Sequence, residues 1–252
     1  ANTFDDAIRW SAEVFFSLKC LLKENNMSTA VGDEGGFASN FSNNFEPIEY
    51  LLKAIKKSGL NPEKDVLISL DIASSEFYSR NKYVLKSDNI KLDSSQIVDY
   101  YKELVTKYPI FSIEDGCSED DWEGWTLLNK TIGNKTLLVG DDLFVTNKNR
   151  LLKGIDKDVA NTILIKPNQI GTLSETLDTI NTARINKIET IISHRSGETE
   201  DNFIADLAVG SNSKFIKTGS VTRSERCSKY NRLLYIEENN NNLVYAGSVL
   251  ND

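Results

Sequence analysis

The sequence has little histidine and cysteine: it contains one histidine, His194, and three scattered cysteines, Cys20, Cys117 and Cys227. Structural zinc sites are built from sets of cysteine and histidine ligands, so this supply excludes a Cys/His zinc site. An odd number of separated cysteines predicts free thiols rather than a disulfide framework. We therefore expect a reducing compartment, the cytoplasm.

Long apolar runs and an excess of positive charge are also missing. No run approaches the roughly 18 apolar residues that a membrane span needs, so we expect no membrane span. The opening residues ANTFDDAIRW lack the basic and apolar parts of a signal peptide. The net charge of −8 disfavours nucleic acid or an anionic membrane surface as a partner.

The chain has no linker rich in proline, glycine or serine, and we predict one domain over residues 1–252. Apolar residues at helical spacing predict a helix over residues 4–25. A second helix is predicted over 44–59, ending at Gly59. The segment between them, residues 28–40, is rich in glycine, serine and asparagine and is typical of a loop.

Six short apolar runs follow, and helical patterns such as those at 94–108 and 201–210 alternate with them. Uninterrupted apolar runs of this length are typical of strands buried on both faces. Strand–helix alternation predicts βαβ units, a parallel sheet and the α/β class. The six predicted strands lie within 65–73, 110–116, 136–144, 162–169, 189–197 and 214–220.

Each predicted strand ends in charged or polar residues. In a parallel barrel the carboxyl ends of all strands lie on one rim, where barrel active sites are built. We therefore expect residues that are distant in sequence to meet there. The strand ends carry Asp71, Glu114, Asp141, Lys166, the His194-Arg195-Ser196 triplet and Lys217.

Three successive strand ends supply carboxylates: Asp71, Glu114 and Asp141. A set of hard oxygen ligands without sulfur or clustered histidine suits Mg²⁺. Any one of these acids alone is more simply explained as a cap of the next helix. Three on consecutive strands favour a metal site.

The later strand ends supply cations. Lys166 and Lys217 can each act as a base beside a metal or as a point charge for a carboxylate or phosphate. Arg195 offers a planar fork for phosphate, and Ser196 a short donor. An ion pair from Arg195 to a nearby acid, Glu198 or Glu200, is an equally good interpretation.

Two further features complete the set. His194, taken alone, is best explained as a hydrogen-bonded core histidine. Glu34 lies among the glycines of GDEGG (32–36), which permit close approach to a ligand, although an ordinary acidic turn also fits. A lysine base, a divalent metal, a phosphate clamp and an acid together indicate proton abstraction next to a carboxylate, with departure of a hydroxyl.

Seven motifs, in order along the chain, closely resemble the enolase family: VGDEGG, LDIASSEF, SIEDGCSEDDWEGW, VGDDLFVTN, LIKPNQIGTLSET, ISHRSGETED and IKTGSVTRSER. The bacterial branch is the most similar. The resemblance implies magnesium-dependent, reversible dehydration of 2-phosphoglycerate to phosphoenolpyruvate. In the enolase superfamily a Lys or His base works with one or two Mg²⁺ ions.

The resemblance also implies a role for each candidate residue. Asp71, Glu114 and Asp141 match magnesium ligands, Lys166 matches the base and Glu34 the acid. His194, Arg195, Ser196 and Lys217 match residues that line the substrate pocket or hold phosphate and carboxylate. A homodimer or octamer is the implied assembly.

The resemblance implies a TIM-type barrel, of which this sequence matches the αα(βα)6 portion. The family's N-terminal α+β domain and first two strands, with a glutamate, a glutamine and a histidine of the site, have no counterpart here. We therefore expect the isolated chain to be poorly active. Two alternatives are a non-catalytic remnant acting as a scaffold, and a superfamily enzyme for a non-phosphorylated acid.

Overall fold

The computed structural model describes residues 1–248, and their contacts divide them into two compact units. Unit 1 comprises residues 1–66 and the chain from residue 192 onward, and unit 2 comprises residues 67–191. The strand order in the main sheet is β1-β5-β6-β7-β8-β9. The α/β class and the six strands predicted from the apolar runs are confirmed for the described residues.

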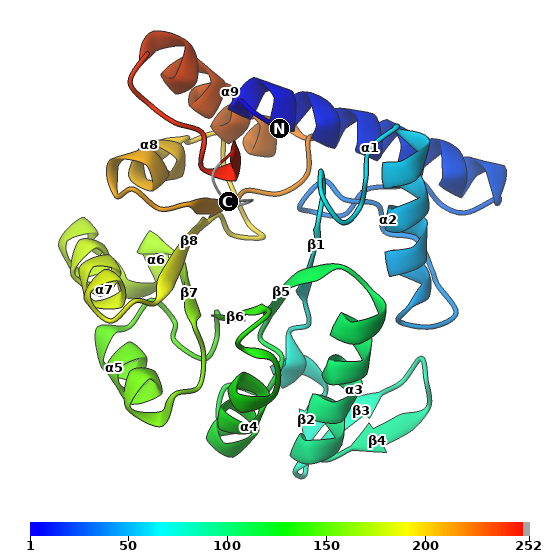
Figure 1. The fold of residues 1–252 in the computed structure, drawn as a ribbon, viewed down its shortest axis with the longest axis vertical. Helices are drawn as coiled ribbons and strands as arrows, with labels where there is room; N and C mark the ends of the chain where they lie inside the picture. The colour runs from blue at the N-terminus through cyan, green and yellow to red at the C-terminus, as the bar shows by residue number, and fades with distance from the viewer. Residues whose placement is uncertain (249–252) are drawn as a thin grey trace. The chain divides into compact units, whose positions relative to one another are not determined.

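Unit 2 holds most of this sheet (Figure 1). Its strands are β1 (Ile68–Asp71), β5 (Ile110–Glu114), β6 (Leu137–Gly140), β7 (Thr162–Ile165) and the start of β8 (Glu189–Ser193). The pairs β1–β5, β5–β6 and β6–β7 are parallel. All four residues of β7 are buried, as expected for a strand covered on both faces.

Helices connect these strands, as the sequence predicted. They are α3 (Ser94–Lys107), α4 (Trp122–Ile132), α5 (Lys148–Lys157), the single turn α6 (Pro167–Ile170) and α7 (Leu173–Ile185). A capping box at Asp93 and Gln96 begins α3, and the carboxylate of Asp121 caps α4. Such caps satisfy backbone N–H groups that have no partner within the helix.

A small antiparallel sheet between β1 and α3 was not predicted. It follows a short 3-10 helix, η1 (Ser74–Phe77), and consists of β2 (Tyr78–Ser79), β3 (Lys82–Leu85) and β4 (Ile90–Leu92). Tyr83 ties it to α4: the fully buried side chain donates its hydroxyl to Asp121 Oδ2 at 2.6 Å and accepts from the Ser118 backbone N–H at 3.0 Å.

Unit 1 contains the remaining elements. They are α1 (Phe4–Glu24), α2 (Glu46–Lys57), the end of β8, α8 (Phe203–Gly210), β9 (Phe215–Lys217), α9 (Ser224–Asn239) and a short 3-10 helix, η2 (Ala246–Ser248). In Figure 1, α1 lies against α2 and α9. The two helices predicted at the start of the chain are confirmed, with ends shifted by one or two residues. The backbone N–H of His194 donates to Lys217 O at 2.9 Å, which joins the ends of β8 and β9.

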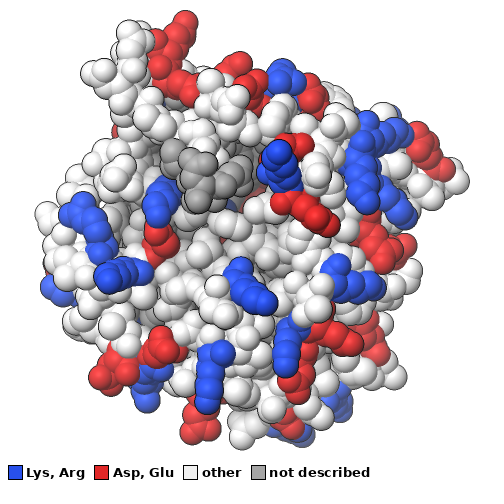
Figure 2. Space-filling view, in the orientation of Figure 1, with Lys and Arg blue, Asp and Glu red and all other residues white. Residues whose placement is uncertain are grey.

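The surface carries charges of both signs. Figure 2 shows basic and acidic side chains interspersed on the face in view. Across residues 1–248, none of the helices combines the length and the apolar character needed to cross a membrane.

Close packing between α5 and the segment after β6 yields a stability prediction. A Cβ added at Gly154 would lie 2.4 Å from Cε1 of the buried Phe144. Gly154→Ala should therefore destabilise the fold by about 1–3 kcal/mol through overpacking. Chemical denaturation measures the free energy of unfolding.

Gly210→Ala is the matched control, because Gly210 ends α8 with no atom within 4 Å of an added Cβ. Alanine there should be neutral or stabilising by about 0.5–1 kcal/mol. Equal stability of the two variants would contradict the packing argument.

Candidate functional site

In unit 2 the predicted site residues lie at the carboxyl ends of consecutive strands. Asp71 is the last residue of β1 and Glu114 the last of β5, whereas Asp141 and Lys166 directly follow β6 and β7. Asp71 and Glu114 are register partners across the β1–β5 pair. The predicted placement at strand ends is therefore confirmed for these four residues.

Lys166 and Asp141 contact each other directly. The Nζ atom of Lys166 lies 2.5 Å from Oδ2 of Asp141, and the two side chains are only 14% and 13% exposed. Gln169 Nε2 donates to the other oxygen, Oδ1, at 3.4 Å. An ion pair this sheltered from water is stronger than a surface pair and fixes the amine against the carboxylate.

A buried acid that the sequence analysis did not consider, Asp115, positions this carboxylate. Its Oδ1 accepts from the backbone N–H of Asp141 at 2.9 Å, and its Oδ2 from that of Asp142 at 2.8 Å. Burial raises the pKa of Asp115 to about 7, although the two backbone donors oppose this shift. Asp115 thereby holds the chain as it leaves β6.

Among residues 1–248, Asp115, Asp141 and Asp142 form an acidic group whose ligand atoms lie within 4.8 Å of one another. Only Asp141 belongs to the predicted ligand set; Glu114 is buried beside Asp115, and Asp71 is exposed. Carboxylate oxygens without sulfur or imidazole suit a hard divalent cation such as Mg²⁺. Asp115 and Asp142 could have been found from the sequence, because each is the second acid of a pair at the carboxyl end of a strand. The pairs are Glu114-Asp115 at β5 and Asp141-Asp142 at β6.

Strained backbone supports Lys166. Val145 and Thr146 have φ values of 45° and 56°, a left-handed conformation that β-branched residues rarely adopt. Thr146 Oγ1 accepts from the Lys166 backbone N–H at 2.8 Å and donates to Gln169 Oε1 at 2.8 Å. The strained turn thus supplies the hydroxyl that holds the start of α6.

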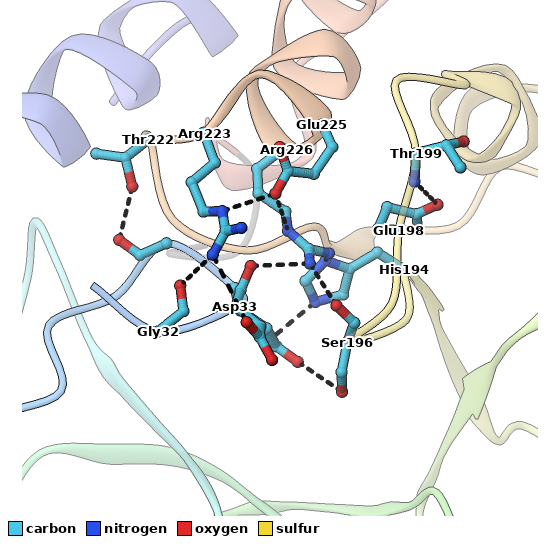
Figure 3. Close-up of polar contacts among 12 residues, drawn as sticks. Gly32, Asp33, His194, Ser196, Glu198, Thr199, Thr222, Arg223, Glu225 and Arg226 are labelled. Carbon is cyan, nitrogen blue, oxygen red and sulfur yellow. Dashed lines mark hydrogen bonds and ion pairs between the residues drawn. The ribbon is translucent and has the colours of Figure 1, made fainter. Parts of the chain in front are cut away.

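In unit 1 the loop that carries Glu34 is anchored to the segment between β9 and α9 (Figure 3). Ser220 N donates to Glu34 O at 2.8 Å, Thr222 Oγ1 to Gly35 O at 2.6 Å, Arg223 Nη1 to Gly32 O at 2.9 Å and Arg226 Nη2 to Asp33 O at 3.0 Å. Four successive carbonyls of GDEGG are therefore occupied, which fixes the loop.

The Glu34 carboxylate faces two of the predicted substrate-binding residues. Oε2 lies 3.3 Å from His194 Nε2, and Oε1 lies 3.4 Å from Ser196 Oγ. Hydrogen bonding to His194 lowers the pKa of Glu34 to about 2, helped by the charges of Lys217 and Arg226 and opposed by partial burial. Glu34, His194 and Ser196 are thus brought together, with Lys217 acting through its charge.

His194 matches the alternative interpretation as well, because its side chain is buried and hydrogen-bonded to Arg226. The half-buried Arg195 follows it. The Glu198 carboxylate accepts from the Arg195 backbone N–H at 3.2 Å and lies 3.7 Å from Nζ of the buried Lys229. Glu198 therefore organises the turn after β8.

Comparison with known proteins identifies the fold. The family model for the enolase C-terminal TIM barrel domain matches residues 1–251. The chain belongs to this family. The resemblance predicted from the seven motifs is confirmed, and so is the TIM-type barrel class.

Curated relatives agree. The chain is 58% identical over 250 residues to an enolase of Helicobacter pylori (strain J99 / ATCC 700824), covering 99% of this chain and 59% of that protein. It is 58% identical over 236 residues to an enolase of a Nitratiruptor species, covering 94% of this chain and 56% of that protein. The chain therefore spans less than two thirds of the length of these enolases.

Acid titration should reveal the contact between Glu34 and His194. The pKa of Glu34 falls from 4.5 to about 2 on folding. Its contribution to stability is therefore complete above pH 4.5 and is lost as the pH falls towards 2. The stability deficit of Glu34→Gln should shrink over this window.

The measurement is urea unfolding at several pH values, with Glu238→Gln, an exposed glutamate of α9, as the control. If the stability deficit of Glu34→Gln stays constant from pH 5 to pH 2, the pKa of the Glu34 carboxyl does not change on folding.

Gly219 tests the anchoring of the loop. Its φ is +83°, and an added Cβ would lie 2.8 Å from both Arg226 Cδ and Glu34 O. Gly219→Ala should therefore lower the free energy of unfolding through steric overlap as well as through backbone strain. Gly59 has a similar φ of +80° with open space around it, so Gly59→Ala measures the strain, about 1–2 kcal/mol.

We expect Gly219→Ala to exceed Gly59→Ala by about 1–3 kcal/mol in the free energy of unfolding. Equal costs would mean that Arg226 and the Glu34 loop move aside freely.

Proposed function

We propose that the protein to which this chain belongs dehydrates 2-phosphoglycerate reversibly to phosphoenolpyruvate and water. The observation that carries the proposal is the contact of Lys166 Nζ with Asp141 Oδ2 at 2.5 Å. It gives a candidate base an immediate neighbour among the candidate metal ligands. Proton abstraction next to a carboxylate needs a base beside a centre of positive charge. Identity of 56–58% to proteins named enolase supports the same reaction.

Mg²⁺ is the proposed cofactor. Asp71, Glu114 and Asp141 would hold it, and the unpredicted Asp115 and Asp142 lie close enough to Asp141 to take part or to orient it. Bound there, Mg²⁺ supplies positive charge that offsets the charge developing on the substrate acid and competes with Lys166 for Asp141. The donor set fits, since all of its members are carboxylates.

Lys166 is the proposed base. In its unprotonated form, with Asp141 engaged by the metal, Nζ would take the proton from the carbon that bears the phosphate, next to the substrate carboxylate. The hydrogen bond from the Lys166 backbone N–H to Thr146 Oγ1 fixes the backbone from which the side chain extends. With its backbone fixed in this way and its Nζ held against Asp141 before substrate binds, the amine starts from a defined position, which lowers the barrier by orientation.

Glu34 is the proposed acid, and it gives its proton to the 3-hydroxyl, which leaves as water. Its pKa of about 2 keeps it ionised at neutral pH in the present arrangement. A substrate that carries phosphate and carboxylate brings negative charge against it. Like charge raises the pKa of a carboxyl and disfavours ionisation. The proposal therefore requires the substrate to help protonate its own acid.

The remaining candidates are proposed to bind the substrate. Arg195 and Lys217 are cations that suit phosphate and carboxylate, Ser196 is a short donor and His194 lines the pocket. A cytoplasmic location and a homodimer or octamer, which the family resemblance implies, stay predictions. So does low turnover by the isolated chain, and the experiment below measures it.

The test follows two readouts with Mg²⁺ present. Ultraviolet absorbance records phosphoenolpyruvate formation, and NMR in D₂O records exchange of the substrate proton, which is sensitive to slow reaction. Lys166→Ala should lower both by about 10²-fold or more, because a general base contributes about 10²–10⁴-fold. Glu34→Gln should lower product formation while exchange continues, because exchange needs the base and not the acid.

Each result has a contrary outcome. Exchange that survives Lys166→Ala would remove the base from the proposal. Turnover of a non-phosphorylated acid but not of 2-phosphoglycerate would favour the superfamily alternative. A folded chain with neither readout, to which Mg²⁺ does not bind, would favour the non-catalytic scaffold.

A further inference from the structure

The guanidinium of Arg226 is buried in unit 1 and surrounded by acceptors. The side chain is 1% exposed, although arginine is rarely buried without partners. Nη1 donates to Arg195 O at 2.7 Å and contacts His194 Nδ1 at 2.6 Å, and Nη2 donates to Ser196 O at 2.7 Å and Asp33 O at 3.0 Å. Figure 3 shows Arg226 among His194, Ser196 and Asp33.

The contact with His194 has only one chemical meaning. A guanidinium has donors and no acceptor, and it stays protonated in proteins. The Nδ1 atom of His194 must therefore accept, so it carries no proton. A histidine with a bare Nδ1 is neutral, and its single ring proton is on Nε2.

The other ring nitrogen faces the candidate acid. His194 Nε2 is buried and makes no hydrogen bond to the described residues, and the nearby acceptor is Glu34 Oε2 at 3.3 Å. A buried donor without an acceptor is costly, so the carboxylate is its natural partner. Arg226 thus donates to Nδ1 of His194, and the remaining ring proton, on Nε2, faces the Glu34 carboxylate.

We propose that Arg226 is a positioning residue that fixes His194 as the neutral Nε2–H tautomer and so presents a donor to the carboxylate of Glu34. The role of Glu34 as acid rests on the proposed function, whereas the tautomer rests on the contacts alone. His194, with Nδ1 occupied and Nε2 protonated, has no lone pair to offer. It cannot compete for the proton that Glu34 delivers, and it stabilises the carboxylate that remains.

The same guanidinium aligns the partners. Two of its four acceptors, the carbonyls of Arg195 and Ser196, directly follow His194 in the turn after β8, and a third, Asp33 O, precedes Glu34. One planar fork therefore fixes the spacing between the imidazole and the carboxylate. A lysine is a point charge with three donors and cannot match this fork.

The chain offers a direct measurement because it contains a single histidine. With ¹⁵N-labelled histidine, one pair of ring nitrogen signals arises, so no residue assignment is needed. Two-bond couplings to the ring protons then distinguish Nε2, which couples to both Hδ2 and Hε1, from Nδ1, which couples strongly to Hε1 alone. We expect a pyridine-like shift for Nδ1 and a pyrrole-like shift for Nε2 in the 252-residue chain at neutral pH. A protonated Nδ1, an imidazolium or a rapidly exchanging mixture of tautomers would overturn the proposal.

Two variants test whether Arg226 is the cause. Arg226→Lys should replace the single signature by a tautomer mixture. Arg223→Lys is the matched control, because Arg223 lies just before α9 and donates to Gly32 O of the same loop, but makes no hydrogen bond to His194 among the described residues. It should retain the signature. An unchanged signature in Arg226→Lys would refute the role of Arg226. Near-ultraviolet circular dichroism identifies a misfolded variant. If Arg226→Lys misfolds, the tautomer measured in the unmutated chain tests the proposal.

Turnover separates this inference from the proposed function. The expected tautomer in a protein that does not act on 2-phosphoglycerate would sink the proposed function and leave the positioning role intact. The wrong tautomer in an active protein would do the reverse.

Discussion

A buried charge must find partners, and this constraint organises both units. Arg226 is almost fully buried, and its guanidinium draws together carbonyls from the GDEGG loop and from the turn after β8. Asp115 does the converse in unit 2, where a buried carboxylate collects backbone N–H groups of the chain leaving β6. Since an unpaired charge in the interior costs several kcal/mol, each group dictates the path of the loops around it.

The two buried groups differ from the residues that they serve. Lys166 in unit 2 contacts a carboxylate side chain, as His194 does in unit 1 with that of Glu34, whereas Asp115 and Arg226 bond mainly to backbone. Bonds to backbone hold a loop whatever its side chains are. The chemistry at the strand ends therefore depends on residues set back from it.

The sequence allowed the strands to be predicted because strands buried on both faces are uniformly apolar, as in β7. The small sheet of residues 78–92 escaped prediction for the opposite reason. Its strands have two to four residues and are partly exposed, so periodicity has too few positions to act on. The hydrogen bond from the Tyr83 hydroxyl to Asp121, which is distant in sequence, ties it to the start of α4.

Some residues of the candidate site could likewise be predicted from the sequence, and others could not. Residues at the ends of parallel strands are predictable, because topology alone places them on one edge, and Asp71 to Lys166 lie there. Arg226 lies in the first turn of α9, 32 residues after the histidine that it contacts. No local pattern reports such a pairing, and only the folded chain reveals it.

At Val145 and Thr146, the stability of the fold conflicts with the positioning of Lys166. Each left-handed β-branched residue costs about 1–3 kcal/mol. Glycine at these positions would relieve the backbone strain itself. It would also remove the hydroxyl on which the Lys166 backbone rests, or loosen the turn that presents it. At these two adjacent residues, selection for stability therefore favours relief of the strain, whereas selection for a precisely positioned Lys166 amine favours the residues present.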